Sequence, residues 1–339
     1  MSDIARRKDE HLDICREDRV ESERASGFAR WRLNYTSLPE IALEDVDLRT
    51  EIAGKTLRAP IIIGAMTGGT EGAGALNKVL AEAAQRTGVG FALGSGRVVI
   101  ERPETASSFQ VRDVAPDVLL FANLGAVQFN YGVSGTDAQR LVDVLEADAL
   151  NLHLNPLQEA IQPEGDTNFR GLAQAMQNAL RDITSPVFVK EVGAGIGPET
   201  AALLATMPLA GVETAGVGGT SWARVEALRH DSEPTRKSGL ALGGFGIPTV
   251  DSLLTCRDLM PEQTIIASGG LRSAEEMAKG LALGADACAC ALPFLKAASK
   301  GVDGVVEAIE DFIHTLAIIH FVCGARTPKE MRGRAQRVG

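Results

Sequence analysis

The sequence predicts an α/β fold, a (β/α)8 (TIM) barrel with an N-terminal extension and a long loop after the sixth strand. Short apolar runs rich in β-branched residues recur along the chain, with helical patterns between them. Eight such runs within 339 residues fit a closed barrel better than a doubly wound sheet. The expected strands cover residues 60–65, 90–94, 118–123, 149–154, 187–191, 210–215, 264–268 and 285–291.

The expected barrel divides the chain into three regions. We expect residues 1–59 to form an N-terminal extension that packs on or over the barrel mouth and residues 60–325 to form the barrel. Residues 326–339 are expected to form a basic C-terminal tail. Glycine-rich residues 216–246, the longest insertion, are typical of a lid, although a plain disordered loop would have a similar composition.

Helical patterns lie between the expected strands, and the last one follows the final strand. They include residues 73–87, 273–283 and 302–323. The pattern over 302–323 is amphipathic and carries Glu307, Glu310 and Asp311, which are too many charges for a segment that spans a bilayer.

Composition narrows the classes of partner. Hydrophobic residues make up 45% of the chain, enough for a sizeable core. The net charge of −10 argues against general electrostatic binding of nucleic acid or of an anionic membrane, so an anionic ligand must be held by specific groups. The first residues contain no apolar segment, so we expect no export signal. The 5 cysteines are scattered without zinc-site spacing, which favours a reduced, cytoplasmic location.

The fourth expected strand carries polar residues where a barrel core should be. Because side chains alternate along a strand, its leucines share one face while Asn151, His153 and Asn155 share the other. Pro156 cannot donate to a sheet ladder, so we expect the strand to end there and residues 158–159, a glutamine and a glutamate, to lie on the loop that follows. Amide, imidazole and carboxylate groups therefore gather at one strand's carboxyl end.

In a barrel the carboxyl ends of all strands open on one face, so other strands deliver groups to the same place. Residues 64–69 are small and allow close approach of a flat ring or an anion. Arg97 has the donor geometry for phosphate, and Asn123 places an amide at the mouth. Either Lys190 or Glu191 must point inward, and the cost of burying an unpaired ammonium favours a functional role for the lysine.

Glycine-rich and small-residue loops follow the seventh and eighth strands, at residues 268–272 and 289–293. Barrels commonly hold a phosphate there through backbone N–H groups. Flavin mononucleotide (FMN) fits the whole set, with its phosphate at these loops and Lys190 near the electron-rich edge of its ring. A sugar or nucleotide phosphate would fit the loops but would not explain Lys190.

A second anion site is expected on the opposite side of the mouth. Glu159 lies among its cations and amides, where one carboxylate can anchor Mg2+ that itself clamps phosphates. The groups that would build this anion site are Ser95, Arg97, His153, Asn155 and the N-terminal cations Arg6, Arg7 and Lys8.

Together these motifs resemble those of the type 2 isopentenyl-diphosphate isomerases, which are FMN-dependent barrels. The resemblance runs through almost the whole chain and includes Arg7-Lys8-x-x-His11, Gly94-Ser95-x-Arg97, His153-x-Asn155-Pro-x-Gln158-Glu159, Val189-Lys190-Glu-Val-Gly, Gly218-Gly-Thr220-Ser-Trp222 and Ser268-Gly-Gly-Leu-Arg272. It implies that FMN contacts Ala65, Met66, Thr67, Ser95, Asn123, Lys190, Thr220, Gly269, Gly270, Leu271, Ala291 and Leu292. It implies that substrate is held by Arg7, Lys8, Ser95, Gly96, Arg97, His153, Asn155 and Gln158, with Glu159 on Mg2+.

The resemblance also implies a reaction, the conversion of isopentenyl diphosphate to dimethylallyl diphosphate in isoprenoid biosynthesis. One proton is added to the terminal alkene carbon and another leaves the allylic position, with reduced FMN as the acid/base catalyst and NADPH or NADH as its reductant. Gln158 and His153 are the candidate catalytic residues. Gln158 does not ionise and would position the substrate, and His153 fits a diphosphate ligand better than a general base. A homo-oligomer, tetramer or octamer, is expected.

One segment departs from the family pattern. The sequence also leaves two alternatives to an isomerase. Residues 243–245 read Gly-Gly-Phe where an acidic residue and a tryptophan are expected, which bears on the packing of the expected lid. The alternative function is an FMN-dependent barrel oxidoreductase of the 2-hydroxy-acid oxidase type, but residues 268–272 contain no histidine to abstract a proton. A catalytically idle flavin- or phosphate-binding scaffold would not need the inward-facing polar residues.

Overall fold

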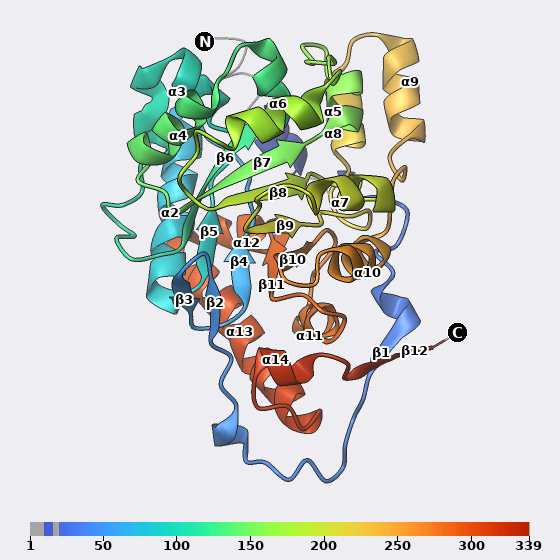
Figure 1. The fold of residues 1–339 in the computed structure, drawn as a ribbon. Coiled ribbons are helices and arrows are strands. Elements are labelled where there is room, and N and C mark those ends of the chain that lie inside the picture. Colours follow the sequence, from blue (N-terminus) through green and yellow to red (C-terminus); the bar gives the residue numbers. More distant parts are fainter. Residues whose placement is uncertain (1–9, 16–19, 339) are drawn as a thin grey trace.

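Eight parallel strands close into a barrel in the computed structural model, which describes residues 10–15 and 20–338 (Figure 1). Around the barrel the order is β10-β11-β4-β5-β6-β7-β8-β9, which confirms the predicted fold class. The strands are β4 (Ile61–Ile63), β5 (Gly90–Ala92), β6 (Leu120–Gly125), β7 (Ala149–Leu154), β8 (Val187–Glu191), β9 (Gly211–Glu213), β10 (Thr264–Ser268) and β11 (Ala287–Cys290). The strands β7, β8 and β10 coincide with their predicted runs, β6 is displaced along the chain, and the others are shorter.

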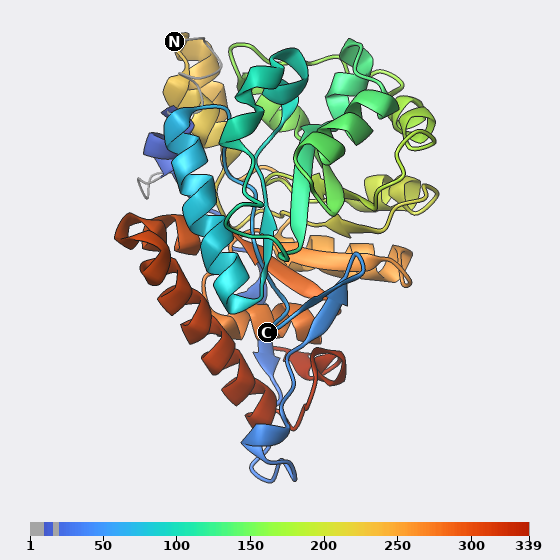
Figure 2. The ribbon, with the colours of Figure 1, turned by 90° about the vertical axis from the view of Figure 1, so that its left-hand side faces the viewer.

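Helices surround the barrel and cover the outer faces of its strands (Figures 1 and 2). The α-helices are α2 (Glu71–Thr87), α3 (Arg97–Glu101), α4 (Gly135–Val144), α5 (Pro156–Ile161), α6 (Leu172–Ala179), α7 (Pro198–Leu204), α8 (Trp222–Arg229), α9 (Glu233–Ala241), α10 (Thr249–Leu259), α11 (Ala274–Ala282), α12 (Leu292–Ala297), α13 (Gly301–Val322) and α14 (Pro328–Met331). The 3-10 helices are η2 (Phe28–Arg30), η3 (Leu43–Asp45), η4 (Pro103–Ser108), η5 (Ala126–Tyr131) and η6 (Ala298–Lys300).

The predicted helices over 73–87, 273–283 and 302–323 correspond to α2, α11 and α13. Local chemistry sets their ends: the Thr70 side chain caps α2, and Gly88 ends it in a left-handed conformation at φ 71°. Figure 2 shows the long α13 beside α2, against which it packs. Within the described residues, no helix is both long and apolar enough to cross a membrane.

The barrel interior has an apolar lower layer and a polar upper layer. Phe121 and Phe188 pack edge to face in the lower layer, with ring centroids 5.2 Å apart. Above them, the strand register places His153 opposite Lys190 and Lys190 opposite Glu213. Because inward-facing positions alternate along each strand, these three polar residues form one layer near the carboxyl ends of the strands.

The described parts of the N-terminal extension lie at both ends of the barrel. Residues 20–22 lie beside the loop after β9, where the Ser22 N–H donates to Gly219 O at 2.8 Å. The hairpin of β2 (Thr50–Ile52) and β3 (Lys55–Leu57) instead closes the opposite end of the barrel. Its Ile52 and Leu57 pack on the apolar lower layer, which seals the barrel from below.

Two other regions are more ordered than the sequence predicts. The insertion 216–246 contains the helices α8 and α9, which pack against each other. The side chain of Phe245, in the segment that departs from the family pattern, is 64% exposed. The expected basic tail contains α14 and the strand β12 (Ala335–Arg337), which pairs antiparallel with β1 (Trp31–Leu33).

Candidate active site

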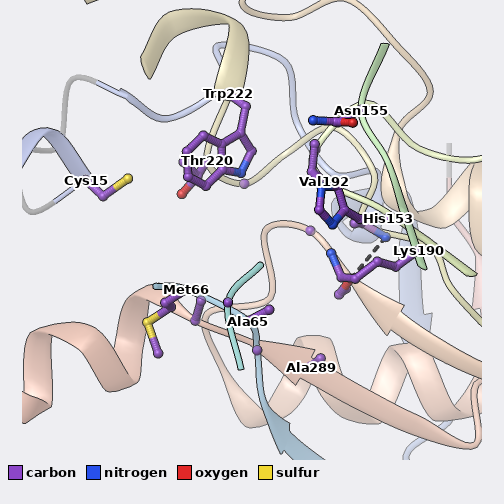
Figure 3. A pocket seen from close by; sticks show the side chains of 18 of the residues that line it. Cys15, Ala65, Met66, His153, Asn155, Lys190, Val192, Thr220, Trp222 and Ala289 are labelled. Atoms are coloured by element: carbon purple, nitrogen blue, oxygen red, sulfur yellow. Dashed lines mark hydrogen bonds between the residues drawn. The ribbon is translucent and has the colours of Figure 1, made fainter. Parts of the chain in front are cut away.

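A single pocket at the carboxyl ends of the barrel strands collects the predicted site residues (Figure 3). Every residue predicted to contact FMN lines it, and so do Arg97, His153, Asn155, Gln158 and Glu159. Gly96 does not line the pocket, because it lies against α4, where an added Cβ would meet Leu141 at 2.8 Å. Arg7 and Lys8 lie outside the described residues. Figure 3 shows His153 and Lys190 on one side of the cavity and Met66 on the other.

Glycines at the ends of β9 and β10 build one wall of the pocket. Gly269 and Gly270 have φ of 102° and 76°, a conformation that L side chains rarely adopt. An added Cβ would lie 2.2 Å from Gly216 O at Gly269 and 2.3 Å from Gly218 O at Gly270, so the two loops interlock without room for side chains. Backbone can therefore approach a bound phosphate or ring closely.

Thr67 lies on the loop after β4 and supports the same interpretation. It is 2% exposed, it lines the pocket, and its Oγ1 has no hydrogen-bond partner within the described residues. Burying a hydroxyl without a hydrogen-bond partner is energetically costly. The Thr67 hydroxyl is therefore placed to bond to a polar atom of a ligand. The residues present thus fit FMN.

His153 is oriented by two residues of the neighbouring strand β6. Its Nδ1 lies 2.7 Å from Asn123 Oδ1. Gly125 is its register partner, and a Cβ there would meet His153 Nε2 at 3.1 Å, so the glycine leaves room for the imidazole ring. The predicted inward face of this strand is confirmed for His153, and its imidazole has a fixed direction.

The prediction that Gln158 and Glu159 lie on a loop is wrong. They lie on α5, which begins at Pro156 directly after β7. Proline lacks the N–H that a sheet ladder needs, but its fixed φ suits the first position of a helix, so the same residue ends the strand and starts the helix. Asn155 precedes the helix and donates through Nδ2 to Glu159 Oε1 at 2.8 Å.

Glu159 is buried, with 8% of its surface exposed, and both oxygens of its carboxylate accept N–H groups. Its Oε2 accepts the Asp166 N–H at 2.6 Å. Asn155 Oδ1 is buried and has no hydrogen-bond partner in the described part of the chain. Within the same residues no group of three or more His, Cys, Asp or Glu side chains could hold a metal ion. The carboxylate of Glu159 is therefore the candidate metal ligand here, since Mg2+ commonly keeps few protein ligands beside phosphate and water oxygens.

Arg97 stands at the start of α3 and is paired with carboxylates. Its Nε donates to Glu101 Oε1 at 2.6 Å, and its Nη1 forms an ion pair with Asp166. Gln128 Nε2 also donates to Asp166, at 2.9 Å. These contacts hold the guanidinium at the pocket wall, where it can exchange a carboxylate for a phosphate oxygen.

Gln158 leads from the pocket to a buried carboxylate. Its Nε2 donates to Glu226 Oε1 at 2.8 Å, and its Oε1 accepts from Asn155 Nδ2 at 3.1 Å, so both ends of the amide are fixed. Glu226 is fully buried on α8, and His11 Nε2 lies 3.0 Å from its Oε1. His11 also packs edge to face on Trp222, with centroids 5.1 Å apart, which brings the first described helical residues to the pocket.

Glu226 is ionised despite its burial. Burial opposes the charge, but His11, Gln158 and Arg229 outweigh it and lower the pKa of Glu226 to about 2. Arg229 Nη1 lies 2.6 Å from Glu226 Oε2 and its side chain is 4% exposed. His11 belongs to a motif shared with the family but has no predicted role, and the sequence does not predict Glu226 or Arg229 as site residues.

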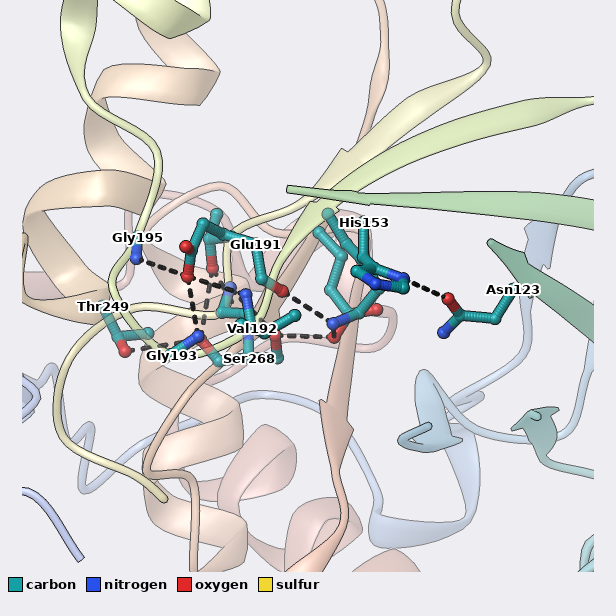
Figure 4. A network of polar contacts seen from close by, with 12 residues as sticks. Asn123, His153, Glu191, Val192, Gly193, Gly195, Thr249 and Ser268 are labelled. Carbon is teal, nitrogen blue, oxygen red and sulfur yellow. Dashed lines mark hydrogen bonds and ion pairs between the residues drawn. The ribbon is translucent and has the colours of Figure 1, made fainter. Parts of the chain in front are cut away.

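The two charged residues at the end of β8 have separate roles. Lys190 faces the pocket, while the Glu191 carboxylate turns back to the loop that follows (Figure 4). Glu191 Oε2 accepts N–H groups from Val192, Gly193, Ala194 and Gly195 at 2.6, 2.7, 2.5 and 3.2 Å. Burial raises the pKa of Glu191, against the lowering by these N–H groups. The sequence predicts that either Lys190 or Glu191 points into the barrel, and the residue that does so is Lys190.

The closed barrel, the glycine-lined wall and the inward lysine define the class of FMN-type (β/α)8-barrel enzymes. The family model for FMN-dependent dehydrogenases matches residues 244–337. Solved structures of the same fold include a mandelate oxidase, at a TM-score of 0.68 with 17% identity over 99% of this chain and 97% of that chain. Another is flavocytochrome b2, at a TM-score of 0.67 with 18% identity over 92% and 77%. At such identities the likeness concerns the fold alone.

Sequence relatives identify the family within that class. The isopentenyl-diphosphate delta-isomerase of Synechococcus sp. is 47% identical over 94% of this chain and 92% of its own length. That of Nostoc sp. is 42% identical over 98% and 96%, and that of Deinococcus radiodurans is 42% identical over 97% and 97%. The chain belongs to the isopentenyl-diphosphate delta-isomerase family, in its FMN-dependent type 2.

Proposed function

We propose that this protein isomerises isopentenyl diphosphate to dimethylallyl diphosphate with reduced FMN. The observation that carries the proposal is one pocket that joins the flavin-type wall of Thr67, Gly269 and Gly270 to the anion-binding groups Arg97 and His153. Relatives with the isomerase name cover nearly the whole chain, which supports this substrate rather than that of the structurally similar oxidases.

The chemistry requires protonation of an unactivated alkene and removal of a proton from the allylic position. FMN in its reduced form would supply the acid and an electron-rich face for developing positive charge. The chain's part is to orient the five-carbon unit. Gln158 suits that role, because Glu226 and Asn155 hold both ends of its amide and leave it a single orientation. A fixed polar group of this kind positions a substrate without exchanging protons.

The diphosphate would lie on the His153 side of the pocket. The contact of His153 Nδ1 with Asn123 Oδ1 fixes the imidazole ring at this wall, where it would bind a phosphate oxygen. Arg97 would release a carboxylate to bind phosphate, and Glu159 would hold Mg2+ between itself and the diphosphate. Arg7 and Lys8 would add cations, which a chain of net charge −10 needs around such a ligand.

Several further properties belong to the same proposal. NADPH or NADH would reduce the flavin once, since the isomerisation itself consumes no electrons. We infer a homo-oligomer, tetramer or octamer, from the family resemblance. Operation in the cytoplasm stays a prediction, which the free cysteines Cys15, Cys256, Cys288, Cys290 and Cys323 support.

Counting turnovers tests the proposal. FMN-loaded protein is reduced anaerobically with a limiting amount of NADPH or dithionite, and isopentenyl diphosphate is added with Mg2+. We expect many product molecules for each molecule of reductant and no product from the oxidised enzyme. Product that rises only in proportion to reductant would contradict an isomerase and favour an oxidoreductase. Oxidised, FMN-loaded protein mixed anaerobically with lactate or mandelate tests the 2-hydroxy-acid oxidase alternative, because oxidation of such a substrate would reduce and bleach the flavin.

A further inference from the structure

Glu213 is a buried acidic residue of the pocket that the proposed isomerase chemistry leaves unused. It ends β9 and is the register partner of Lys190 on β8. Its side chain is 6% exposed and that of Lys190 is 8% exposed, and both residues line the pocket. Two opposite charges therefore stand side by side in the polar layer of the barrel, directly above the apolar layer that contains Phe188.

The two charges are close but not in direct hydrogen-bond contact. Lys190 Nζ donates to the carbonyl oxygen of Glu191 at 2.6 Å, and its distance to Glu213 Oε1 is 3.7 Å. Glu213 Oε1 instead accepts the hydroxyl of Ser268 at 2.8 Å. Ser268 Oγ accepts the Ala215 N–H at 3.0 Å, which fixes the hydroxyl in turn. The serine thus holds the carboxylate near the ammonium but out of contact with it.

We propose that Glu213 is a positioning residue that partly neutralises Lys190 and thereby sets the reduction potential of bound FMN. The inference rests on the FMN part of the proposed function. Two-electron reduction of the flavin with uptake of one proton adds one negative charge to the ring. A nearby ammonium favours the reduced form, and a carboxylate beside that ammonium opposes the effect.

The distance between Lys190 and Glu213 determines how much positive charge the flavin ring would experience. A bare buried lysine would bind the reduced ring tightly but would itself be costly without a partner. A direct Lys–Glu contact would remove most of the positive field from the ring. The arrangement held by Ser268 lies between these extremes, because Lys190 lines the pocket while the carboxylate of Glu213 stands 3.7 Å from its ammonium.

Reduction potentials of FMN-loaded variants test this role without any measurement of activity. Glu213→Gln should raise the reduction potential of bound FMN by about 30 mV. For a two-electron couple, this shift means that the protein's preference for reduced over oxidised FMN increases about tenfold. Ser268→Ala should shift it the opposite way, because the released carboxylate can close on Lys190. The control is Glu310→Gln, which removes a carboxylate paired with Arg58 away from the pocket and should leave the potential unchanged.

A double-mutant cycle shows whether Glu213 acts through Lys190. Lys190→Met should lower the reduction potential of bound FMN. In a protein that already carries Lys190→Met, Glu213→Gln should change the preference for reduced over oxidised FMN less than threefold. The same tenfold change with and without the lysine would overturn the proposal, since Glu213 would then act on the flavin directly. A potential that is unchanged or lower in Glu213→Gln would also overturn it.

Two outcomes separate this inference from the proposed function. Wild-type protein that loads FMN and isomerises substrate, but whose Glu213→Gln variant keeps the wild-type potential, refutes only the inference. Wild-type protein that takes up no FMN refutes both. If Glu213→Gln fails to fold or to load FMN, Ser268→Ala decides alone: a lowered potential supports the role of Glu213, and an unchanged or raised one overturns it.

Discussion

Replacing Glu226 with glutamine should destabilise the protein at neutral pH, because folding lowers the pKa of this carboxyl. In the folded protein the pKa of Glu226 is about 2, against an ordinary value of 4.5. At about 1.4 kcal/mol for each pKa unit, that difference corresponds to about 3 kcal/mol of stability. Removal of the charge from a buried pair gives a similar cost of about 3–5 kcal/mol, because Arg229 keeps its charge in the interior.

The sign of the pH dependence follows from the direction of the shift. A carboxyl whose pKa is lowered by folding stabilises the protein above its ordinary pKa, and that stability is lost as pH falls from about 5 to about 2. The stabilities of wild type and Glu226→Gln should therefore differ most at pH 7 and converge toward pH 3. Glutamine does not titrate, so the variant should lose less stability than the wild type as the pH falls.

Urea unfolding of the flavin-free protein measures the effect without the contribution of bound FMN. With a slope of about 3 kcal/mol per M, the midpoint at pH 7 should fall by about 1 M. Glu310→Gln is the control, because Glu310 pairs with Arg58 at the surface, where an ion pair contributes about 0–1 kcal/mol. Equal midpoints at pH 7, or a gap between the proteins that stays constant down to pH 3, would refute the reasoning.

Three other changes should affect separate parts of the site. Glu159→Gln should raise the Mg2+ concentration for half-maximal activity at least tenfold while the FMN Kd stays the same; an unchanged Mg2+ dependence would contradict the metal assignment. Gly270→Ala should weaken FMN binding at least tenfold in a fluorescence titration, since its Cβ would lie 2.3 Å from Gly218 O. Gly301→Ala is its control, with a φ of +75° but open space around it, and equal losses in both would point to backbone strain alone. Deletion through Lys8 should leave FMN bound but raise the KM or abolish turnover, and Arg7→Ala alone should lower kcat/KM by about tenfold; wild-type kinetics after deletion would make this segment dispensable.

Much of the barrel could be predicted because its signals are local. The bounds of β7 and β8 follow from apolar runs whose alternation also separates the outward leucines from the inward His153. Pro156 shows where local rules are incomplete, since the lost N–H ends a strand but does not tell whether a loop or a helix follows. The hairpin 50–57 shows another limit, because its pattern does not reveal which end of the barrel it closes.

The missed part of the site depends on contacts between residues far apart in sequence. Glu226 and Arg229 stand three positions apart on α8, a spacing typical of a solvated helix face. They are buried because α8 packs against α5 and α9, and no periodicity in α8 itself indicates those neighbours.

Burial changes what these charges can do. Because Glu226 bonds both His11 and Gln158, one carboxylate links the first described residues of the chain to the amide proposed to orient the substrate. His11 itself lines the pocket, so the described residues 10–15 reach the site. These residues begin two positions after Lys8 in sequence, and this closeness along the chain is the reason to test Arg7 and Lys8 as substrate ligands.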